Sequence, residues 1–279
     1  MNIKILRGIT LSLKYMLLTF LCILVMSPVL TAILGSVRTT GDFILRPFAL
    51  PQGEWQWQHY TDVLLSDSFW RSMRNSLIIT FFTVVLNVSL ACMLAFAFTR
   101  LSFRGRKTLF NILSIGLMFP ITVAILPIFT QIRQLDWIDS YWGVIMPLVA
   151  FGLPQSTIIL RSFFIAIPNE LADASYVDGC TTFGFFRHIL LPMARPAIMA
   201  VVVIQIIISW NEYFLPLLVL NEDDLWTLPL GIMQFQGQFG TDWSRVMAYV
   251  VLLIIPAVIF YIFAEKYIVT GLTGGELKG

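Results

Sequence analysis

The sequence predicts an all-α polytopic membrane protein with six transmembrane helices. Hydrophobic residues make up 58% of its 279 positions and charged residues only 12%, whereas soluble domains are about half apolar and about a quarter charged. A water-soluble core cannot hide so much apolar surface. A helix needs about 20 apolar residues to cross the hydrocarbon layer. Six stretches are close to this length, at residues 15–34, 77–98, 109–132, 142–165, 197–220 and 246–263.

The spans are expected to pack as one bundle over residues 15–264. The first span is too long and uninterrupted for a cleaved signal peptide, and no small-residue cleavage site follows it. Membrane helices tolerate internal prolines when neighbouring helices satisfy the freed carbonyls, and such prolines occur here at Pro28, Pro120, Pro127, Pro147, Pro154 and Pro256. Residues 1–14 then form an N-terminal segment and residues 265–279 a tail.

Basic residues set the expected orientation. With an even number of spans both termini lie on one side of the membrane, and that side receives most of the 18 basic residues. The short loop at 100–107, RLSFRGRK, has four basic residues and no acid, and short loops are where the positive-inside rule is most reliable. Both termini and residues 168–196 are therefore expected to be cytoplasmic.

Three loops are expected on the outer side, and residues 133–141 form the short one among them. Residues 35–76 are rich in Trp and Tyr, which fits either an interfacial aromatic belt or a surface that meets a partner. Residues 221–245 begin with acids and continue with Gln, Gly and Phe. That loop reads equally well as a docking loop and as a plain solvated connection.

The segment 168–196, PNELADASYVDGCTTFGFFRHILLPMARP, interrupts the apolar spans. Asn169 as N-cap and Gly179 as terminator predict a helix over 170–178. A helix this short is marginal alone. Its three acids disfavour the anionic inner leaflet, whereas apolar groups on two flanks suit a groove on a protein partner. An ordinary cytoplasmic hairpin is the alternative. A second short helix follows, capped by Thr181 or Thr182 and ended by Pro192.

This segment resembles the EAA loop of binding-protein-dependent ABC importer permeases, P-x-E-L-x-E-A-A-x-x-D-G-A followed by I-x-L-P. The matching residues are Pro168, Glu170, Leu171, Asp173, Ala174, Ser175, Asp178, Gly179, Cys180, Ile189, Leu191 and Pro192. Asp173 stands where the motif has Glu, and Ser175 and Cys180 stand where it has Ala. The segments RNSLIIT at 74–80, SWNEYFLPL at 209–217 and GLTGGELKG at 271–279 resemble the carbohydrate branch, specifically the second permease of the maltose type.

The resemblance, which covers residues 70–279, implies a type I ABC importer permease fold in a bacterial inner membrane. It implies that 168–196 carries a coupling helix that docks on a separate ATPase subunit. The coupling residues would be Glu170, Leu171, Asp173, Ala174, Ser175, Asp178 and Gly179. The implied partners are a second homologous permease, two ATP-binding cassette subunits that hold ATP and Mg, and an extracytoplasmic solute-binding protein. The tail is expected to lie along the ATPase, and loop 221–245 to reach the binding protein.

The chain itself is expected to be no enzyme and to bind no cofactor. It has no G-x-x-x-x-G-K-[ST] phosphate loop, because the glycines and lysine of the tail have the wrong spacing. It has no H-E-x-x-H or G-x-S-x-G motif. The only histidines, His59 and His188, are expected on opposite sides of the membrane, so they cannot share a metal site or a catalytic triad.

Glu212 is the one acid inside a predicted span. Ionisable groups in a membrane usually face a cavity or a partner, and the flanking Trp210, Asn211 and Tyr213 suit sugar recognition. Two roles stay open for these residues: a substrate pathway or gate, and a structural hydrogen bond to the partner permease. Asn87 and Gln205, also inside spans, are expected to make interhelical hydrogen bonds.

The predicted function is that of a permease subunit which moves a sugar or an oligosaccharide into the cytoplasm, driven by ATP hydrolysis in a partner. The alternative is an ion-coupled secondary transporter, which needs ion-coupling acids in broken midplane helices. Only Glu212 is available for that role, and no inverted repeat is evident. A membrane enzyme would need a nucleophile and a base on one side of the membrane, and the sequence offers no such pair.

Overall fold

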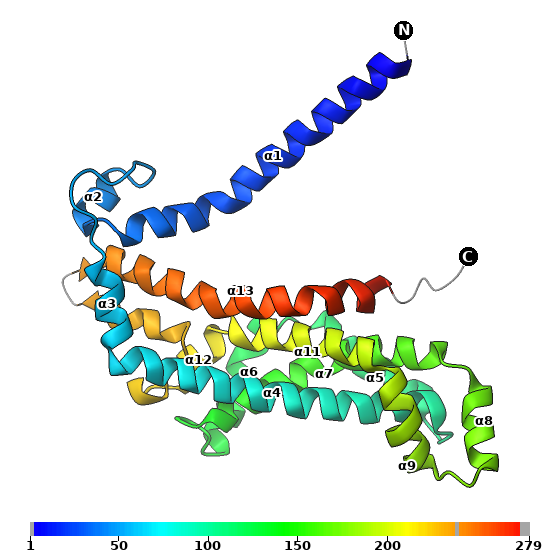
Figure 1. The fold of residues 1–279 in the computed structure, drawn as a ribbon. Coiled ribbons are helices and arrows are strands. Elements are labelled where there is room, and N and C mark those ends of the chain that lie inside the picture. The colour runs from blue at the N-terminus through cyan, green and yellow to red at the C-terminus, as the bar shows by residue number, and fades with distance from the viewer. Residues whose placement is uncertain (1–2, 238–239, 274–279) are drawn as a thin grey trace. The chain divides into compact units, whose positions relative to one another are not determined.

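The computed structural model describes residues 3–237 and 240–273, and helices dominate these residues (Figure 1). The chain forms two compact units. The first is built from the residues up to 69 and from 232–255, and the second from 70–231 and from 256 onwards. Two long helices, α4 (Asp67–Arg100) and α13 (Trp243–Thr273), each contribute to both units.

The first unit carries α1 (Ile3–Ser36), α2 (Thr40–Leu45), α3 (Gln58–Leu65) and the hairpin of β1 (Gln236–Gly237) and β2 (Gly240–Thr241). Antiparallel pairing places Gln236 opposite Thr241. The loop after α1 folds around one buried cation, because the guanidinium of Arg38 donates to the carboxylate of Asp42 at 2.6 Å and to the carbonyls of Arg46 and Ala49 at 2.8 Å each. The aromatic loop 35–76 is therefore ordered by polar contacts as well as by apolar packing.

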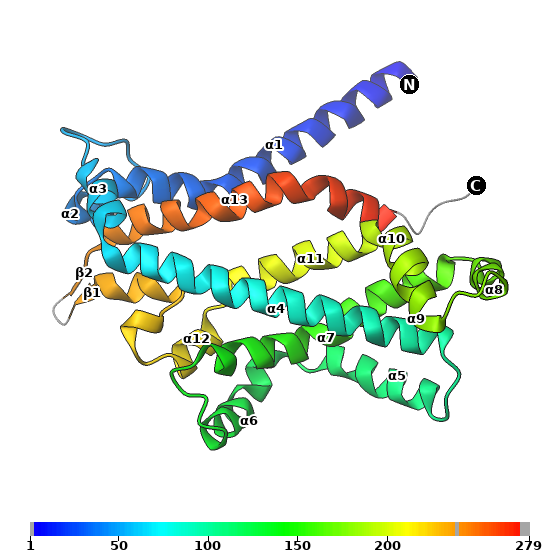
Figure 2. The ribbon, with the colours of Figure 1, turned by 60° about the horizontal axis from the view of Figure 1, so that its bottom comes forward.

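The second unit is a bundle around α4, α7 and α11, which lie side by side in Figures 1 and 2. Its remaining helices are short or bent. In chain order the elements are α5 (Arg106–Ile115), η1 (Gly116–Met118), α6 (Ile121–Gln134), α7 (Tyr141–Ala166), α8 (Asn169–Val177), α9 (Thr182–Phe185), the π-helical turn η2 (Phe186–Leu190), α10 (Leu191–Met193), α11 (Arg195–Trp210), α12 (Phe214–Val219) and η3 (Asp223–Leu225). The 3₁₀ helix η4 (Leu230–Phe235) leads from this unit into the first.

The all-α polytopic prediction is confirmed. Four helical stretches of the described chain are long and apolar enough to cross a membrane: Leu11–Ser36, Asp67–Arg100, Tyr141–Ala166 and Trp243–Ile262. Two bent pairs bring the number up to six if each pair is one span. They are Arg106–Met118 with Ile121–Gln134, bent by 105°, and Thr182–Met193 with Arg195–Trp210, bent by 76°.

Two expected spans are not single straight helices. The stretch 109–132 breaks at Phe119, whose extended backbone (φ −97°, ψ 109°) precedes Pro120. A proline disfavours the helical conformation of the residue before it. The stretch 197–220 breaks at residues 211–213, between α11 and α12. Pro216 explains this break, because its ring would clash with the carbonyl of residue 212 in a continuous helix.

The helices at the chain ends run past the expected span boundaries. α1 begins at Ile3 rather than near residue 15, and α13 continues to Thr273, so the first part of the expected tail 265–279 is helical. Residues 274–279, which complete the motif GLTGGELKG, lie outside the described residues. Helices often continue beyond the hydrocarbon, because their backbone hydrogen bonds are internal and persist in water as well as in lipid.

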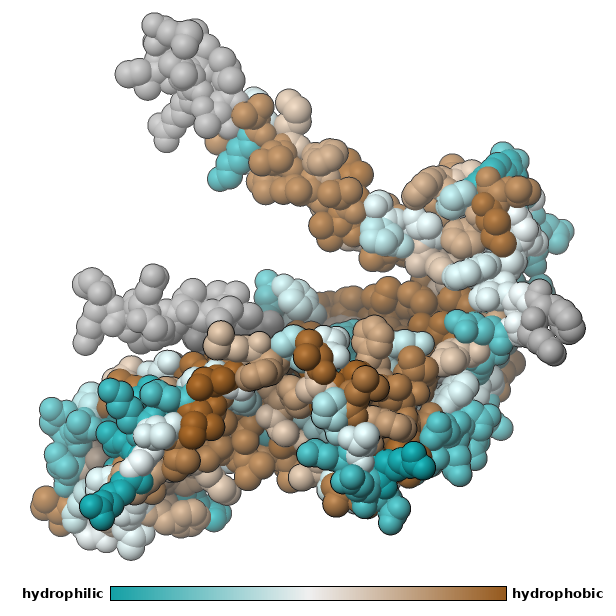
Figure 3. Space-filling view, turned by 180° about the vertical axis from the view of Figure 1, so that it is seen from behind, coloured by the Kyte–Doolittle hydropathy of each residue, from teal (hydrophilic) through white to brown (hydrophobic). Residues whose placement is uncertain are grey.

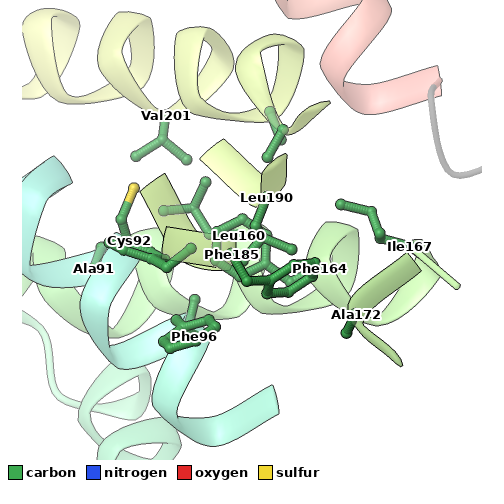
Figure 4. Packing of buried hydrophobic residues seen from close by; sticks show 14 residues of the cluster. Ala91, Cys92, Phe96, Leu160, Phe164, Ile167, Ala172, Phe185, Leu190 and Val201 are labelled. Atoms are coloured by element: carbon green, nitrogen blue, oxygen red, sulfur yellow. The ribbon is translucent and has the colours of Figure 1, made fainter. Parts of the chain in front are cut away.

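The core of the second unit joins buried residues of α4, α7 and α11 to Ala172 of α8 and Phe185 of α9 (Figure 4). Small residues of α4, Ala91 and Ala95, let Leu160 and Phe164 of α7 approach closely, and Phe185 and Leu190 close the cluster. On the face drawn in Figure 3, hydrophobic residues cover the middle of this unit and hydrophilic residues gather at its two ends. Such a band is expected of a surface that faces lipid between two aqueous phases.

A buried polar network ties α4, α7 and α11 together within the apolar bundle. Asn87 donates to the carbonyl of Val149 at 3.0 Å and accepts from the hydroxyl of Ser156 at 2.6 Å. Gln205 donates to the same hydroxyl at 3.0 Å. The expected interhelical hydrogen bonds of Asn87 and Gln205 are therefore present. They pass beside Gly152, whose missing side chain leaves room for both amides.

Candidate functional site

Helix α8 spans Asn169–Val177, one residue earlier at each end than predicted. The helix ends just before Gly179, the residue predicted to terminate it. Gly179 has φ +82°, a conformation that costs an L-residue about 1–2 kcal/mol. Its amide donates to the carbonyl of Tyr176 at 3.1 Å, and the amide of Cys180 donates to the carbonyl of Ser175 at 2.9 Å. This pair of bonds is the Schellman motif, and it turns the chain sharply at the exposed tip of the segment.

The start of α8 differs from the prediction. Pro168, not Asn169, occupies the N-cap position, and no side chain caps the helix there. The amide oxygen of Asn169 instead accepts a hydrogen bond from Arg100 at the end of α4. The following turn is capped as expected, because Thr181 Oγ1 accepts from the amide of Gly184 at 3.1 Å.

The expected coupling residues divide between two faces of α8. The exposed residues are Glu170, Leu171, Asp173, Ala174, Asp178 and Gly179. The remaining one, Ser175, is buried together with Ala172 and donates to the carbonyl of Ala172 at 2.7 Å, and its coupling role stays a prediction. The helical period places these two small residues against the bundle, where Figure 4 shows Ala172 near Phe164 and Ile167. The acids and the apolar residues thus face outward together.

Large apolar side chains on this outward face are unusually open to solvent. Val177 is 88% exposed, Tyr176 42% and Leu171 39%. Tyr176 keeps one contact to the bundle, with its ring centroid 6.0 Å from that of Phe185. Apolar groups beside carboxylates on an exposed, well-terminated helix suit insertion into a groove of a protein partner. This arrangement matches the expectation for a docking helix better than that for a solvated hairpin.

The second expected site, residues 210–213, lies at the break between α11 and α12. Trp210 is 2% exposed and packs edge-on against Phe260 at 5.6 Å. The Trp210 ring faces the protein interior, and a place for it on a substrate pathway stays a prediction. The Glu212 carboxylate accepts from the amide of Leu215 at 3.1 Å and so caps the first turn of α12. Asn211 is exposed, and Glu212 and Tyr213 are half-buried.

Several polar contacts hold the first part of loop 221–245 to the bundle, among them an ion pair of Arg71 with Asp224 at 2.6 Å. Asn75 donates to the carbonyls of Asp224 at 2.8 Å and Trp226 at 3.0 Å. Asp139 accepts from the amides of Asn221 at 2.5 Å and Glu222 at 3.1 Å. Burial raises the pKa of the Asp139 carboxyl, but these hydrogen bonds outweigh that effect, and its pKa lies below the ordinary value.

The second part of the loop belongs to the first unit. Gln234 and Phe235 line an open pocket of about 410 Å³ with Asp62, Val63, Ser66 and Arg245. Arg245 forms an ion pair with Asp62 at 2.9 Å on its rim. The described part of the loop is thus folded, and whether it docks a partner stays a prediction. Among the described residues no group of three or more His, Cys, Asp or Glu side chains could hold a metal ion.

Replacing Asn75 with Ala is expected to release the loop around residues 221–226. The buried amide makes two bonds to loop carbonyls and accepts a third from the hydroxyl of Tyr141 at 2.8 Å. Loss of the Asn75 side-chain amide should reduce the stabilisation free energy of the folded loop by about 1–3 kcal/mol. Limited proteolysis in detergent micelles should show faster cleavage within the loop. Tyr141→Phe removes one bond and should have a smaller effect; equal cleavage of all three proteins would contradict the anchoring role.

Comparisons with known proteins find a solved structure with a similar fold and a family model that matches the chain. A bacterial ABC transporter involved in the import of the acidic polysaccharide alginate contains a chain with a TM-score of 0.81 at 23% identity, covering 93% of this chain and 96% of that chain. This likeness concerns the fold. Residues 87–269 match the family model of the binding-protein-dependent transport system inner membrane component. The chain belongs to this family.

Two relatives of the family show how far the similarity extends. The arabinooligosaccharides transport system permease protein AraQ of Bacillus subtilis is 31% identical over 274 residues, 97% of this chain and 96% of the relative. The trehalose/maltose transport system permease protein MalG of Thermococcus litoralis is 33% identical over 283 residues, with both chains fully covered. The region that matches the family model contains α8 and residues 210–213, so both candidate sites lie within it.

Membership makes the chain a multi-pass inner membrane component of a transport system. Sequence reasoning overlooked the roles of Arg100, Asn75 and Gly152. Arg100 was read only as a topology signal, and Asn75 only as part of a matching segment. A basic residue at a predicted helix end and a glycine in the middle of a predicted span are the signals that could have identified two of them.

Proposed function

We propose that this chain is a permease subunit of an ATP-driven importer that carries a sugar or an oligosaccharide into the cytoplasm. The observation that carries the proposal is α8, which ends in a Schellman turn and presents acids and apolar groups outward beside the bundle. The relatives support the substrate class, because their names refer to arabinooligosaccharides and to trehalose and maltose.

The proposed assembly has four kinds of subunit. This chain pairs with a second homologous permease, two ATPase subunits bind the α8 helices of the two permeases, and a solute-binding protein delivers the sugar from outside. A structural relative has been solved as a bacterial alginate ABC transporter with an alginate pentasaccharide-bound periplasmic protein. ATP and Mg are held by the ATPases, and this chain is non-catalytic. Both of its termini lie in the cytoplasm.

The mechanism follows from how α8 is joined to the bundle. On its N-terminal side α8 is separated from α7 by Ile167 and Pro168 alone, and on its C-terminal side α9, η2 and α10 lead directly into α11. When the ATPases close, they displace α8, and the displacement is passed into α7 and α11. The break at residues 211–213 lies at the far end of α11. Asn211, Glu212 and Tyr213 therefore form part of the gate that the movement opens.

Reconstitution into liposomes tests the proposal. The complex of both permeases and the ATPases is supplied with the binding protein and a panel of labelled maltose, trehalose and arabinooligosaccharides. Uptake of one of these saccharides is expected only when ATP is present on the side of the ATPases. Accumulation by this chain alone under an ion gradient, without ATP, would instead support an ion-coupled secondary transporter.

A further inference from the structure

Arg100, the last residue of α4, lies where α7 ends and α8 begins. Its Nη2 donates to the carbonyl of Phe164 at 2.9 Å and to the carbonyl of Ile167 at 2.6 Å. Its Nη1 donates to the amide oxygen of Asn169. One guanidinium therefore holds the final turn of α7, the residue that ends α7 and the first residue of α8.

The chemistry of this position favours an arginine. The last carbonyls of a helix have no partner within the helix and carry the negative end of its dipole. The guanidinium at the end of α4 faces the C-terminal carbonyls of α7. A planar guanidinium presents donors in a fixed fork, whereas a lysine ammonium is a single point charge. A lysine ammonium has three donors but lacks the fixed fork, so it should hold the carbonyls and the Asn169 amide together less well.

The Arg100 contact adds to the attachment of α8, whose fully buried side chains are small and whose Tyr176 ring contacts Phe185. The buried residues of α8 are Ala172 and Ser175, two of the smallest side chains. Stabilisation by burial scales with apolar area, so these two residues define the position of α8 only weakly. In the described chain, side chains of α8 take part in two hydrogen bonds. One joins Arg100 to Asn169, and the other runs from the Ser175 hydroxyl to the carbonyl of Ala172 within the same helix.

We infer that Arg100 is a positioning residue that passes the displacement of α8 into α4 as well as into α7. The inference rests on the proposed function, since it concerns how force from the ATPases enters the bundle. α4 is one uninterrupted helix of 34 residues. It carries Arg100 at one end, Asn87 of the buried network in its middle, and Asn75, which anchors loop 221–226, near its other end. Through Arg100, α4 links the docking helix to that loop.

The test uses the complete importer in liposomes and measures solute transported per ATP hydrolysed. Asn169→Ala cuts the link to α8 but leaves the α7 carbonyls bound, so the chain should fold and assemble. Arg100→Lys keeps the positive charge but removes the planar guanidinium with its fixed set of donors. Both variants should hydrolyse ATP near the wild-type rate. The amount of solute transported per ATP hydrolysed should fall about tenfold, which corresponds to the loss of about 1.4 kcal/mol of interaction free energy. Adding Asn169→Asp to Arg100→Lys creates an ion pair across the same gap and should restore most of the ratio.

Arg104→Lys is the matched control, because Arg104 is exposed in the same basic loop, and its ratio should equal that of the wild type. Two outcomes overturn the inference. One is a wild-type ratio in both Arg100→Lys and Asn169→Ala. The other is a parallel loss of ATP hydrolysis and transport that Asn169→Asp does not rescue, which would indicate a purely structural role. Absence of ATP-driven uptake by the wild-type complex would count against the proposed function itself.

Discussion

Gly179→Asp is expected to abolish ATP-driven uptake while leaving the chain inserted in the membrane and folded. Among the described residues, apart from its own chain neighbours, no atom lies within 4 Å of the position that a Cβ would take at Gly179. Aspartate is among the few residues that tolerate a positive φ, and the strain is limited to about 1–2 kcal/mol. A complete loss of uptake therefore requires that a partner surface approaches this turn closely. Uptake by the assembled complex and its ATP hydrolysis are the measurements.

Gly105→Asp provides a matched control within the same chain. Gly105 also has a positive φ, of 83°, and within the described part of the chain no atom beyond its chain neighbours lies within 4 Å of its Cβ position. Both glycines are expected on the cytoplasmic side, so the two variants add the same charge with the same backbone strain. Gly105→Asp should transport at close to the wild-type rate. Normal uptake by Gly179→Asp in an assembled complex would remove the main support for docking at α8.

Gly152→Ala is expected to destabilise the bundle by about 1–3 kcal/mol, the usual cost of overpacking a filled core. The new Cβ would lie 2.6 Å from Gln205 Oε1 and 2.7 Å from Asn87 Nδ2. Both amides are held by hydrogen bonds to Ser156 or Val149, so neither can retreat without breaking one. The measurement is reversible unfolding in mixed micelles, followed by circular dichroism.

Gly41→Ala is the control for Gly152→Ala. Gly41 lies in α2 with no atom within 4 Å of its Cβ position, and alanine in place of a helical glycine is favourable by up to about 1 kcal/mol. Its unfolding midpoint should equal or exceed that of the wild type. If Gly152→Ala unfolds with the same midpoint as Gly41→Ala, the network at Asn87 and Gln205 is loose enough to admit a side chain, and the packing argument fails.

The sequence predicts some features of this fold better than others, for physical reasons. The end of α8 was predictable because a glycine stop is a local signal. The breaks at Phe119 and at residues 211–213 were not, since Pro28, Pro127 and Pro154 stay inside helices that continue past them. Whether a proline bends or breaks a membrane helix depends on what satisfies the freed carbonyls, and neighbouring helices decide that.

At the candidate site, too, some features were predictable from the sequence and others were not. The hydrophobic period could not decide that Ser175 faces inward, because small residues occur on both flanks of α8. The Asn169 side chain fits a cap by its type, yet it is engaged by Arg100, 69 positions away in the chain. Trp210 reads as a pathway residue beside Glu212 but is buried against Phe260. Contacts between distant segments determined each of these outcomes.

The claim that α8 docks on an ATPase can be tested by site-specific photocrosslinking in the assembled importer. A benzophenone amino acid at Val177, which is 88% exposed, probes the outward face of α8. Leu65, 84% exposed at the end of α3, serves as a reference position expected on the outer side of the membrane. The account predicts an adduct between position 177 and the ATPase subunit, with and without ATP, and no ATPase adduct from position 65. Exclusive crosslinking of position 177 to lipid, or no adduct in either nucleotide state, would contradict it.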